Sequence, residues 1–251
     1  NDLICSCICR PELRPDAADP QAWAGNFSDK LGRSESLPGF DDTSLRRDQR
    51  VAKALAQNGA PWLEVRRVDN MALPDDGLYS GEASQNGQPH GQGVQSWIDG
   101  TEYKGSWVDG TAHGEGKLVK SDGSGYEGQW ADGRKQGEGY EWLPDAEYRG
   151  QFADGQKHGS GHSKWKDDSS YIGSFFEDQM HGAGTFRWGD DRSYNGQWAQ
   201  GQLHGHGKFT WPNGKSFDGR YERDKKQGTG TFFWPDGSKC SGTWQRGKQH
   251  G

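Results

Sequence analysis

Histidines that precede glycines are the most prominent candidates for catalytic or metal-binding chemistry in this sequence. They are His90, His113, His158, His181, His204 and His250. If two strands separate successive copies, equivalent histidines lie about 9–10 Å apart. Because a zinc–nitrogen bond is only about 2 Å long, neighbouring copies could not share one ion. We therefore predict no metal site and expect each histidine to hydrogen-bond the backbone of a turn.

No other stretch of the sequence indicates catalysis. Residues 123–128 match the pattern G-x-G-x-x-G. They lead from a turn into a strand, however, and so offer no helix N-terminus to a phosphate group. The sequence shows no G-x-S-x-G elbow, no Walker loop and no evident cysteine–histidine pair. We therefore predict no catalytic residue and no cofactor, and we expect that the protein is not an enzyme.

Three cysteines form a second chemical cluster near the start of the chain. Cys5, Cys7 and Cys9 alternate beside Leu3 and Ile4, so an extended chain would point all three thiols the same way. Such a cluster is typical of S-palmitoylation, and two acyl chains suffice for stable membrane anchoring. Reduced, unmodified thiols are the plainer alternative. A metal or redox site is the least favoured, because the C-x-C-x-C spacing has no fourth ligand nearby.

A repeat of nearly constant length positions the histidines. An aromatic-x-Gly opening recurs every 22 to 24 residues, at Tyr79, Tyr103, Tyr126, Tyr148, Tyr171, Tyr194 and Phe217, and Cys240 replaces the aromatic in the last copy. In the copy at 194–198, Tyr, Gly and Trp share one face of a strand. We expect a loop that ends at His204-Gly205, a second strand over 207–211 and a turn at 212–214. The chain is therefore a repeat array of hairpins.

This pattern, Y-x-G-x-W-x-x-G-x-x-H-G-x-G, resembles the MORN repeat (membrane occupation and recognition nexus). Eight copies cover residues 77–251, the last of them incomplete. The departures are Ala83, Phe152 and Phe175 in place of Trp, and Gln136 and Gln227 in place of His. Only 29% of the chain is hydrophobic, but it has 40 glycines and 12 tryptophans. We therefore expect an all-β fold, an elongated, twisted, single-layer antiparallel sheet of tandem hairpins with a short, partly helical N-terminal region.

Two further segments precede the array. Residues 1–42 are polar and read as a flexible segment that carries the cysteine cluster. Residues 43–76 read as a cap, with a helix from about 45 to 57 and a strand over 61–65 that covers the edge of the first repeat. A basic amphipathic helix that lies on a membrane is the alternative for 45–57.

Aromatic residues form two ladders that could bind a partner. The first contains Trp107, Trp130, Phe152, Phe175, Trp198, Tyr221 and Trp244, and the second contains Trp97, Trp165, Trp188, Trp211 and Trp234. Adjacent rings packed on each other would account for both ladders. If the sheet curves, its concave face would instead present a groove for an extended or helical segment of a protein partner.

Charge is unevenly distributed along the array. Residues 77–207 carry 11 basic and 19 acidic side chains, whereas residues 208–251 carry 9 basic and 4 acidic ones. The acidic part disfavours nucleic acid as a partner. The basic end could contact an anionic lipid or an acidic partner through Lys215, Arg220, Arg223, Lys225 and Lys226. A solvated surface of mixed charge is the alternative.

These features together predict a non-catalytic scaffold. The resemblance implies that the chain binds a protein partner and tethers it to a membrane, or to cortical or ciliary cytoskeleton, on the cytosolic side. It also implies a possible homodimer through the C-terminal repeats. Two alternatives stay open: the targeting module of a larger enzyme, and an array that binds phosphoinositides.

Overall fold

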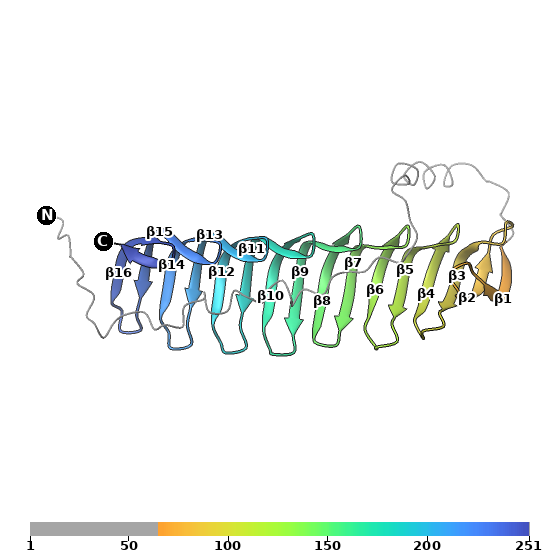
Figure 1. The fold of residues 1–251 in the computed structure, drawn as a ribbon, viewed down its shortest axis with the longest axis horizontal. Helices are drawn as coiled ribbons and strands as arrows, with labels where there is room; N and C mark the ends of the chain where they lie inside the picture. The colour runs from red at the N-terminus through yellow and green to blue at the C-terminus, as the bar shows by residue number, and fades with distance from the viewer. Residues whose placement is uncertain (1–64, 251) are drawn as a thin grey trace. The chain divides into compact units, whose positions relative to one another are not determined.

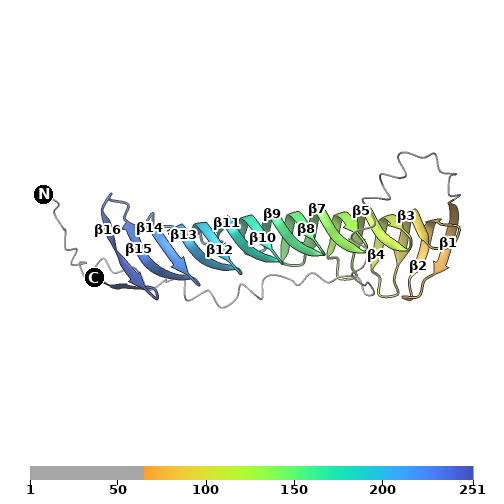
Figure 2. The same cartoon turned by 90° about the horizontal axis from the view of Figure 1, so that it is seen from above.

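The protein is built from β-hairpins. The computed structural model describes residues 65–250, which form seventeen strands and no helix. The strands belong to one antiparallel sheet in which each strand pairs with its neighbours in sequence (Figures 1 and 2). This confirms the all-β, antiparallel fold expected from the repeats. The chain divides into two compact units, an N-terminal unit that includes residues 65–159 and a C-terminal unit that includes residues 160–250.

The N-terminal unit begins with a strand that covers the first repeat. Its strands are β1 (Arg66–Ala72), β2 (Leu78–Ala83), β3 (Pro89–Ser96), β4 (Glu102–Val108), β5 (Thr111–Val119), β6 (Gly125–Ala131), β7 (Arg134–Leu143) and β8 (Ala146–Ala153). Strand β1 pairs antiparallel with β2. The covering strand was expected over 61–65, of which residues 61–64 lie outside the described residues. The helix expected from 45 to 57 lies outside the described residues.

The C-terminal unit repeats the same pairing. Strand β9 (Gln156–Trp165) contains the boundary between the units, and it is followed by β10 (Ser170–Phe176), β11 (Gln179–Arg187), β12 (Ser193–Ala199), β13 (Gln202–Thr210), β14 (Ser216–Glu222), β15 (Lys225–Phe233), β16 (Lys239–Gln245) and β17 (Lys248–His250). The last copy, counted as incomplete in the sequence, still forms a short hairpin, because β17 pairs with β16 over three residues.

The hairpins are tighter than the sequence suggested. Gln200 and Gly201 form a two-residue turn with φ of 52° and 74°, so β13 starts at Gln202 and includes the His204-Gly205 element. Two positive φ angles match the right-handed twist of the flanking strands. Gly205, at φ 57°, lies where the register of the pair shifts. The expected loop up to His204-Gly205 is therefore wrong, because a bulge takes up the extra residues.

A buried tyrosine anchors each of six repeats. The hydroxyl of Tyr194 donates a hydrogen bond to the carbonyl of Gln197 at 3.1 Å. A Cβ added to Gly207 would lie 2.3 Å from that hydroxyl oxygen, and one on Gly196 would lie 2.5 Å from it. Both glycines are therefore needed, because the ring lies directly against the backbone of the paired strand. The same hydroxyl-to-carbonyl bond occurs at Tyr79, Tyr103, Tyr126, Tyr148 and Tyr171.

Burial further favours the neutral form of five of these hydroxyls, those of Tyr79, Tyr103, Tyr126, Tyr171 and Tyr194. It raises the pKa of Tyr79 to about 12, and it raises the pKa of Tyr171 and Tyr194 well above the usual value. A neutral hydroxyl can donate to a carbonyl, whereas a phenolate cannot. The anchors therefore stay intact throughout the physiological pH range.

A backbone hydrogen bond links six of the tight turns to the preceding repeat. The N–H of Gly133 donates to the carbonyl of Ala112 at 2.9 Å. Equivalent bonds join Gly110 to Pro89, Gly155 to Lys135, Gly201 to Met180, Asp224 to Leu203 and Gly247 to Lys226. Neighbouring repeats are thus held together by turn contacts as well as by the pairing of their strands.

Candidate functional site

The first aromatic ladder forms the core. Its seven members are between 2% and 5% exposed. Trp107 lies edge-on between Tyr79 and Tyr103, with ring centroids 5.3 Å and 5.0 Å away. Members of the ladder therefore alternate with the anchor tyrosines in one packed row, so each ring contacts the rings beside it rather than the next member of its own ladder. Edge-to-face packing of this kind is worth about 0.5–1.5 kcal/mol per pair beyond the area buried.

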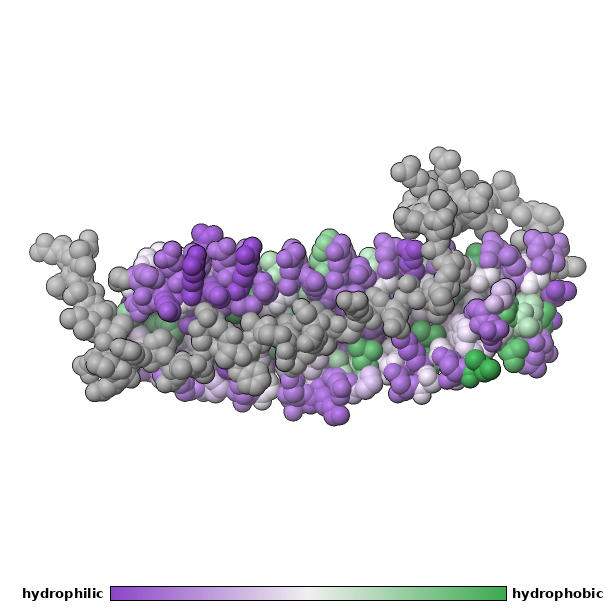
Figure 3. All heavy atoms as spheres, viewed as in Figure 1, coloured by the Kyte–Doolittle hydropathy of each residue, from purple (hydrophilic) through white to green (hydrophobic). Residues whose placement is uncertain are grey.

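The second ladder is continuous in the C-terminal unit, where phenylalanines fill the gaps between its tryptophans. We call this row the aromatic ribbon: Trp165, Phe186, Trp188, Phe209, Trp211, Phe232 and Trp234. Successive ring centroids lie between 4.6 and 5.7 Å apart. The phenylalanines and Trp165 are buried, whereas Trp188, Trp211 and Trp234 are partly exposed. On the face drawn in Figure 3, most of the described residues that can be seen are hydrophilic.

Short loops hold the exposed tryptophans in place. The N–H of Trp211 donates to the carbonyl of Lys215 at 2.9 Å, and its carbonyl accepts from the N–H of Gly214 at 3.0 Å. The side chain of Asn213 accepts from the N–H of Lys215 at 3.1 Å. Equivalent backbone bonds close the loops that follow Trp188 and Trp234. The three rings are therefore presented on rigid turns, one per repeat.

The indole N–H groups of these three tryptophans are available to a ligand. Among the described residues, those of Trp188, Trp211 and Trp234 have no acceptor, and none of the three is sealed from solvent. In the N-terminal unit, Trp97 has the same place in its loop, but its indole N–H donates to Asp75 at 3.0 Å. The indole N–H groups of Trp188, Trp211 and Trp234 thus lack an acceptor among the described residues, whereas that of Trp97 has one.

Two of the histidines, His90 and His113, lie beside the turn of the following repeat. Nδ1 of His90 lies 3.6 Å from a carboxylate oxygen of Asp109, and Nδ1 of His113 lies 3.9 Å from that of Asp132. Among residues 65–250, no three metal-ligating side chains come together. In these two repeats the histidine lies beside a carboxylate of the next turn, and Nδ1 of His90 has no hydrogen-bond partner among the described residues. The expected hydrogen bond to turn backbone is therefore not made by this atom.

The two glutamines at the histidine position make the equivalent link to backbone. Oε1 of Gln136 accepts a hydrogen bond from the N–H of Asp154 at 3.1 Å. Oε1 of Gln227 accepts one from the N–H of Arg246 at 3.0 Å. Each of these residues bonds the first position of the next tight turn. The departures from the repeat pattern therefore preserve the contact between repeats.

In two repeats of the N-terminal unit, the residue just before the histidine position is a buried lysine, Lys135 or Lys157. Glu141 accepts a hydrogen bond from Lys135 on one oxygen and lies 3.0 Å from Nζ of Lys157 on the other. All three side chains are buried. Burial alone would raise the pKa of Glu141, but the ammonium groups of Lys157 and Lys135 outweigh it, so the pKa is lowered. The cluster is saturated by its own members and is a structural element of the core.

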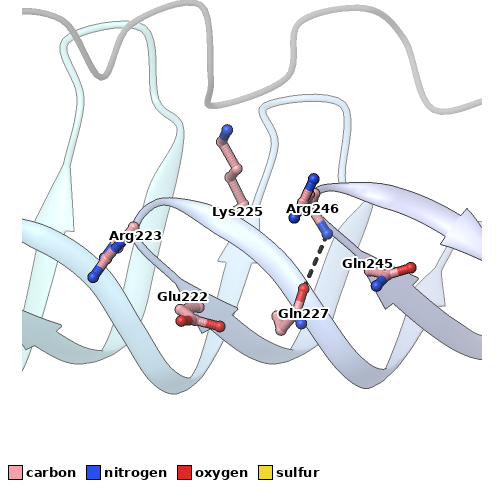
Figure 4. A pocket seen from close by; sticks show the side chains of 6 residues that line it. All are labelled: Glu222, Arg223, Lys225, Gln227, Gln245 and Arg246. Carbon is pink, nitrogen blue, oxygen red and sulfur yellow. Dashed lines mark hydrogen bonds between the residues drawn. The ribbon is translucent and has the colours of Figure 1, made fainter.

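Two adjacent tight turns form a basic pocket in the C-terminal unit (Figure 4). The pocket encloses about 450 Å³ and is lined by Glu222, Arg223, Lys225, Gln227, Gln245 and Arg246. Figure 4 shows Lys225 between the two arginines. Arg223 and Arg246 have φ of 49° and 51°, a left-handed conformation that costs roughly 1–2 kcal/mol for a residue other than glycine.

The structure separates the five basic residues that the sequence grouped as one contact. Arg223 and Lys225 line the pocket, and Arg246 joins them. Lys226 is buried, with Nζ 4.9 Å from the ring centroid of Phe232, so it is not available to a lipid or partner. Lys215 lies in an interstrand loop and Arg220 in the middle of β14. Alternation along β15 explains why Lys225 is exposed and Lys226 is not.

The sequence also raised the question of how the chain could associate with a membrane. Cys5, Cys7 and Cys9 lie outside the described residues. Within residues 65–250, no helix is available to cross a bilayer.

Comparison with known proteins identifies the repeat. The family model described as "MORN repeat" matches residues 85–102, 103–125, 126–145, 148–170, 171–191, 194–216, 217–239 and 240–251. Its eight matches agree with the eight copies counted in the sequence, although the first begins after β2. No curated protein matches the chain.

Solved structures with a detectable likeness have low similarity. The G-box domain of the microcephaly protein CPAP has a TM-score of 0.35 at 14% identity, covering 72% of this chain and 99% of that chain. The TCP10 domain of Danio rerio CPAP, solved with a peptide of Danio rerio STIL, has a TM-score of 0.32 at 11% identity, covering 71% and 84%. Virginiamycin B lyase from Staphylococcus aureus has a TM-score of 0.18 at 6% identity, covering 72% and 74%. Likenesses at this level carry no argument about function.

Proposed function

Because the chain belongs to the MORN-repeat family, we propose that it is a non-catalytic scaffold that binds a protein partner along the aromatic ribbon. The observation that carries this proposal is the row of Trp188, Trp211 and Trp234, which are partly exposed at intervals of one repeat. Tryptophans on rigid loops supply large contact areas at a small cost in conformational entropy, and they are enriched among residues that dominate binding energy. The buried first ladder supports the sheet and leaves contact with the partner to the ribbon.

Site-specific crosslinking tests this function. A photoreactive residue is placed at exposed Pro235, next to Trp234, or at exposed Thr229, in the middle of β15. We expect a defined protein adduct from position 235 and none from position 229. The adduct is identified by mass spectrometry, and the purified partner is then bound to the purified chain. Equal adducts from both positions, or none from either, would refute binding along the ribbon.

The scaffold would also be tethered to a membrane through an acylated N-terminus. The support is the clustering of Cys5, Cys7 and Cys9, since two or more acyl chains give stable anchoring. Changing all three to serine should move the protein from the membrane fraction to the soluble fraction. Cys240→Ser is the matched control, because this fourth cysteine is buried in a repeat. A triple variant that still pellets with membranes would rule out the tether. Attachment to cortical or ciliary cytoskeleton would then be the alternative.

The basic pocket is a second candidate contact, for an acidic group of the partner. The support is the convergence of Arg223, Lys225 and Arg246 at one pocket. Replacing both arginines by glutamine should weaken partner binding and reduce its dependence on salt. Unchanged partner binding together with lost binding to anionic vesicles would assign the pocket to lipid instead.

A further inference from the structure

We propose that the aromatic ribbon binds a proline-rich segment in the polyproline II conformation, with one turn of the ligand on each repeat. This rests on the proposed scaffold function and names the kind of segment that the partner contributes. Three properties of the ribbon support it: its spacing, its free hydrogen-bond donors and the charge around it.

The spacing of the repeats matches the pitch of polyproline II. Each repeat adds two strands and so advances by about 9.4–9.8 Å. Polyproline II advances about 9.3 Å per turn of three residues, whereas seven residues of an α-helix advance about 10.5 Å. From Trp188 to Trp234, two repeats on, the accumulated mismatch is about 0.2–1.0 Å for polyproline II and about 1.4–2.2 Å for the helix. An extended proline-rich ligand therefore stays in register with successive tryptophans.

The indole N–H groups of the ribbon, which have no acceptor among residues 65–250, can donate to a ligand that offers free acceptors. The carbonyls of an α-helix are already bonded within the helix. Polyproline II has no internal hydrogen bonds, so its carbonyls can accept from indole donors. Trp188, Trp211 and Trp234 supply one such donor per repeat, whereas the indole N–H of Trp97 is already bonded to Asp75. Aromatic rings that also pack against proline rings are the usual lining of grooves that bind proline-rich segments.

Charge around the ribbon favours acidic flanks on the ligand. Residues 160–250 carry 13 basic and 10 acidic side chains. The exposed basic side chains of this unit include Arg223, Lys225 and Arg246, which line the basic pocket. A proline-rich segment flanked by glutamate therefore fits better than one flanked by lysine or arginine.

The test measures binding of synthetic peptides to the full chain by fluorescence anisotropy. The probe has about nine prolines between glutamate pairs, which spans about 28 Å and so covers three repeats. The comparator replaces the prolines by alanines, which favour the helix. Trp211→Phe keeps an aromatic ring but removes the N–H donor, and Trp97→Phe is the matched control. Thermal unfolding of both variants confirms that they fold.

We expect the proline peptide to bind at least tenfold more tightly than the alanine peptide. Trp211→Phe should weaken that binding about two- to tenfold, as the loss of one hydrogen bond predicts, and Trp97→Phe should leave it unchanged. Equal binding of both peptides, no binding of the proline peptide, or equal effects of the two variants would overturn the inference. If the partner crosslinks at position 235 but the proline peptide does not compete with it, the scaffold function stands and the polyproline ligand is wrong.

Discussion

Trp198 offers the sharpest test of how the repeats are stabilised. Its ring is 2% exposed and stands nearly perpendicular to the rings of Tyr194 and Tyr171, with centroids 5.3 Å and 5.5 Å away. Its indole N–H donates to the carbonyl of Gly184 at 3.2 Å. Trp198→Ala removes both ring contacts, leaves a cavity and deprives a backbone carbonyl of its donor. We expect it to lower the free energy of unfolding by about 3–5 kcal/mol.

Thermal unfolding followed by circular dichroism measures this effect. A protein of this size loses about 2–4 °C of Tm per kcal/mol, so the expected fall is about 6–20 °C. Ile172→Ala is the control, because Ile172 is 61% exposed and its truncation should change Tm by no more than about 2 °C. Hydrogen exchange should show the loss of protection concentrated around β12 and β13, since repeats contact only their neighbours. Equal Tm values for the two variants would refute the assignment of Trp198 to the core.

Gly207→Ala should cost about 1–3 kcal/mol in urea denaturation through overpacking, because its Cβ would lie 2.3 Å from the hydroxyl oxygen of Tyr194; a neutral result would show that the ring can move. Glu141→Gln should cost about 3–5 kcal/mol by leaving two buried ammonium groups without a counter-charge. Because the pKa of Glu141 is lowered from 4.5, its stabilisation is complete above that pH and is lost as pH falls through the folded-state pKa. The Tm values of wild type and this variant should therefore converge in acid, and a constant gap would contradict the pairing. Gln136→Ala should cost about 1 kcal/mol by removing the acceptor for Asp154, whereas Gln136→His should be tolerated; equal losses in denaturant would count against that link between repeats.

Local periodicity was sufficient to predict the strands and the side of the sheet that is buried. Alternation in 194–198 places Tyr194 and Trp198 on one face, and both are buried. The constant repeat length predicts tandem hairpins, which the structure confirms. Properties that depend on side-chain alternation and on spacing alone were therefore accessible from the sequence.

Turn geometry and the exposed site were less accessible. The pair Gln200-Gly201 lacks the Asn-Gly signature of a two-residue turn, so the tight hairpin and the bulge at Gly205 were read as a loop. The sequence placed Trp97 and Trp211 in one ladder, but a carboxylate far away in the chain decides which of them has a free N–H. Arg246 was not selected for the basic contact, because only the pairing of β14 to β17 brings its turn beside that of Arg223.

The backbone bond from a tight turn to the preceding repeat has an evolutionary consequence. Gly133 needs the carbonyl of Ala112, and the repeat that contains Gly133 in turn presents the carbonyl of Lys135 to Gly155. A duplicated segment of one whole period, 23 residues in most copies, would therefore arrive with its donors and acceptors already matched to both neighbours. A duplication of any other length would leave main-chain groups unpaired and would be removed by selection. Genes for such arrays should lengthen and shorten in whole repeats, so that the length of partner they accommodate changes in steps of one turn of the ligand.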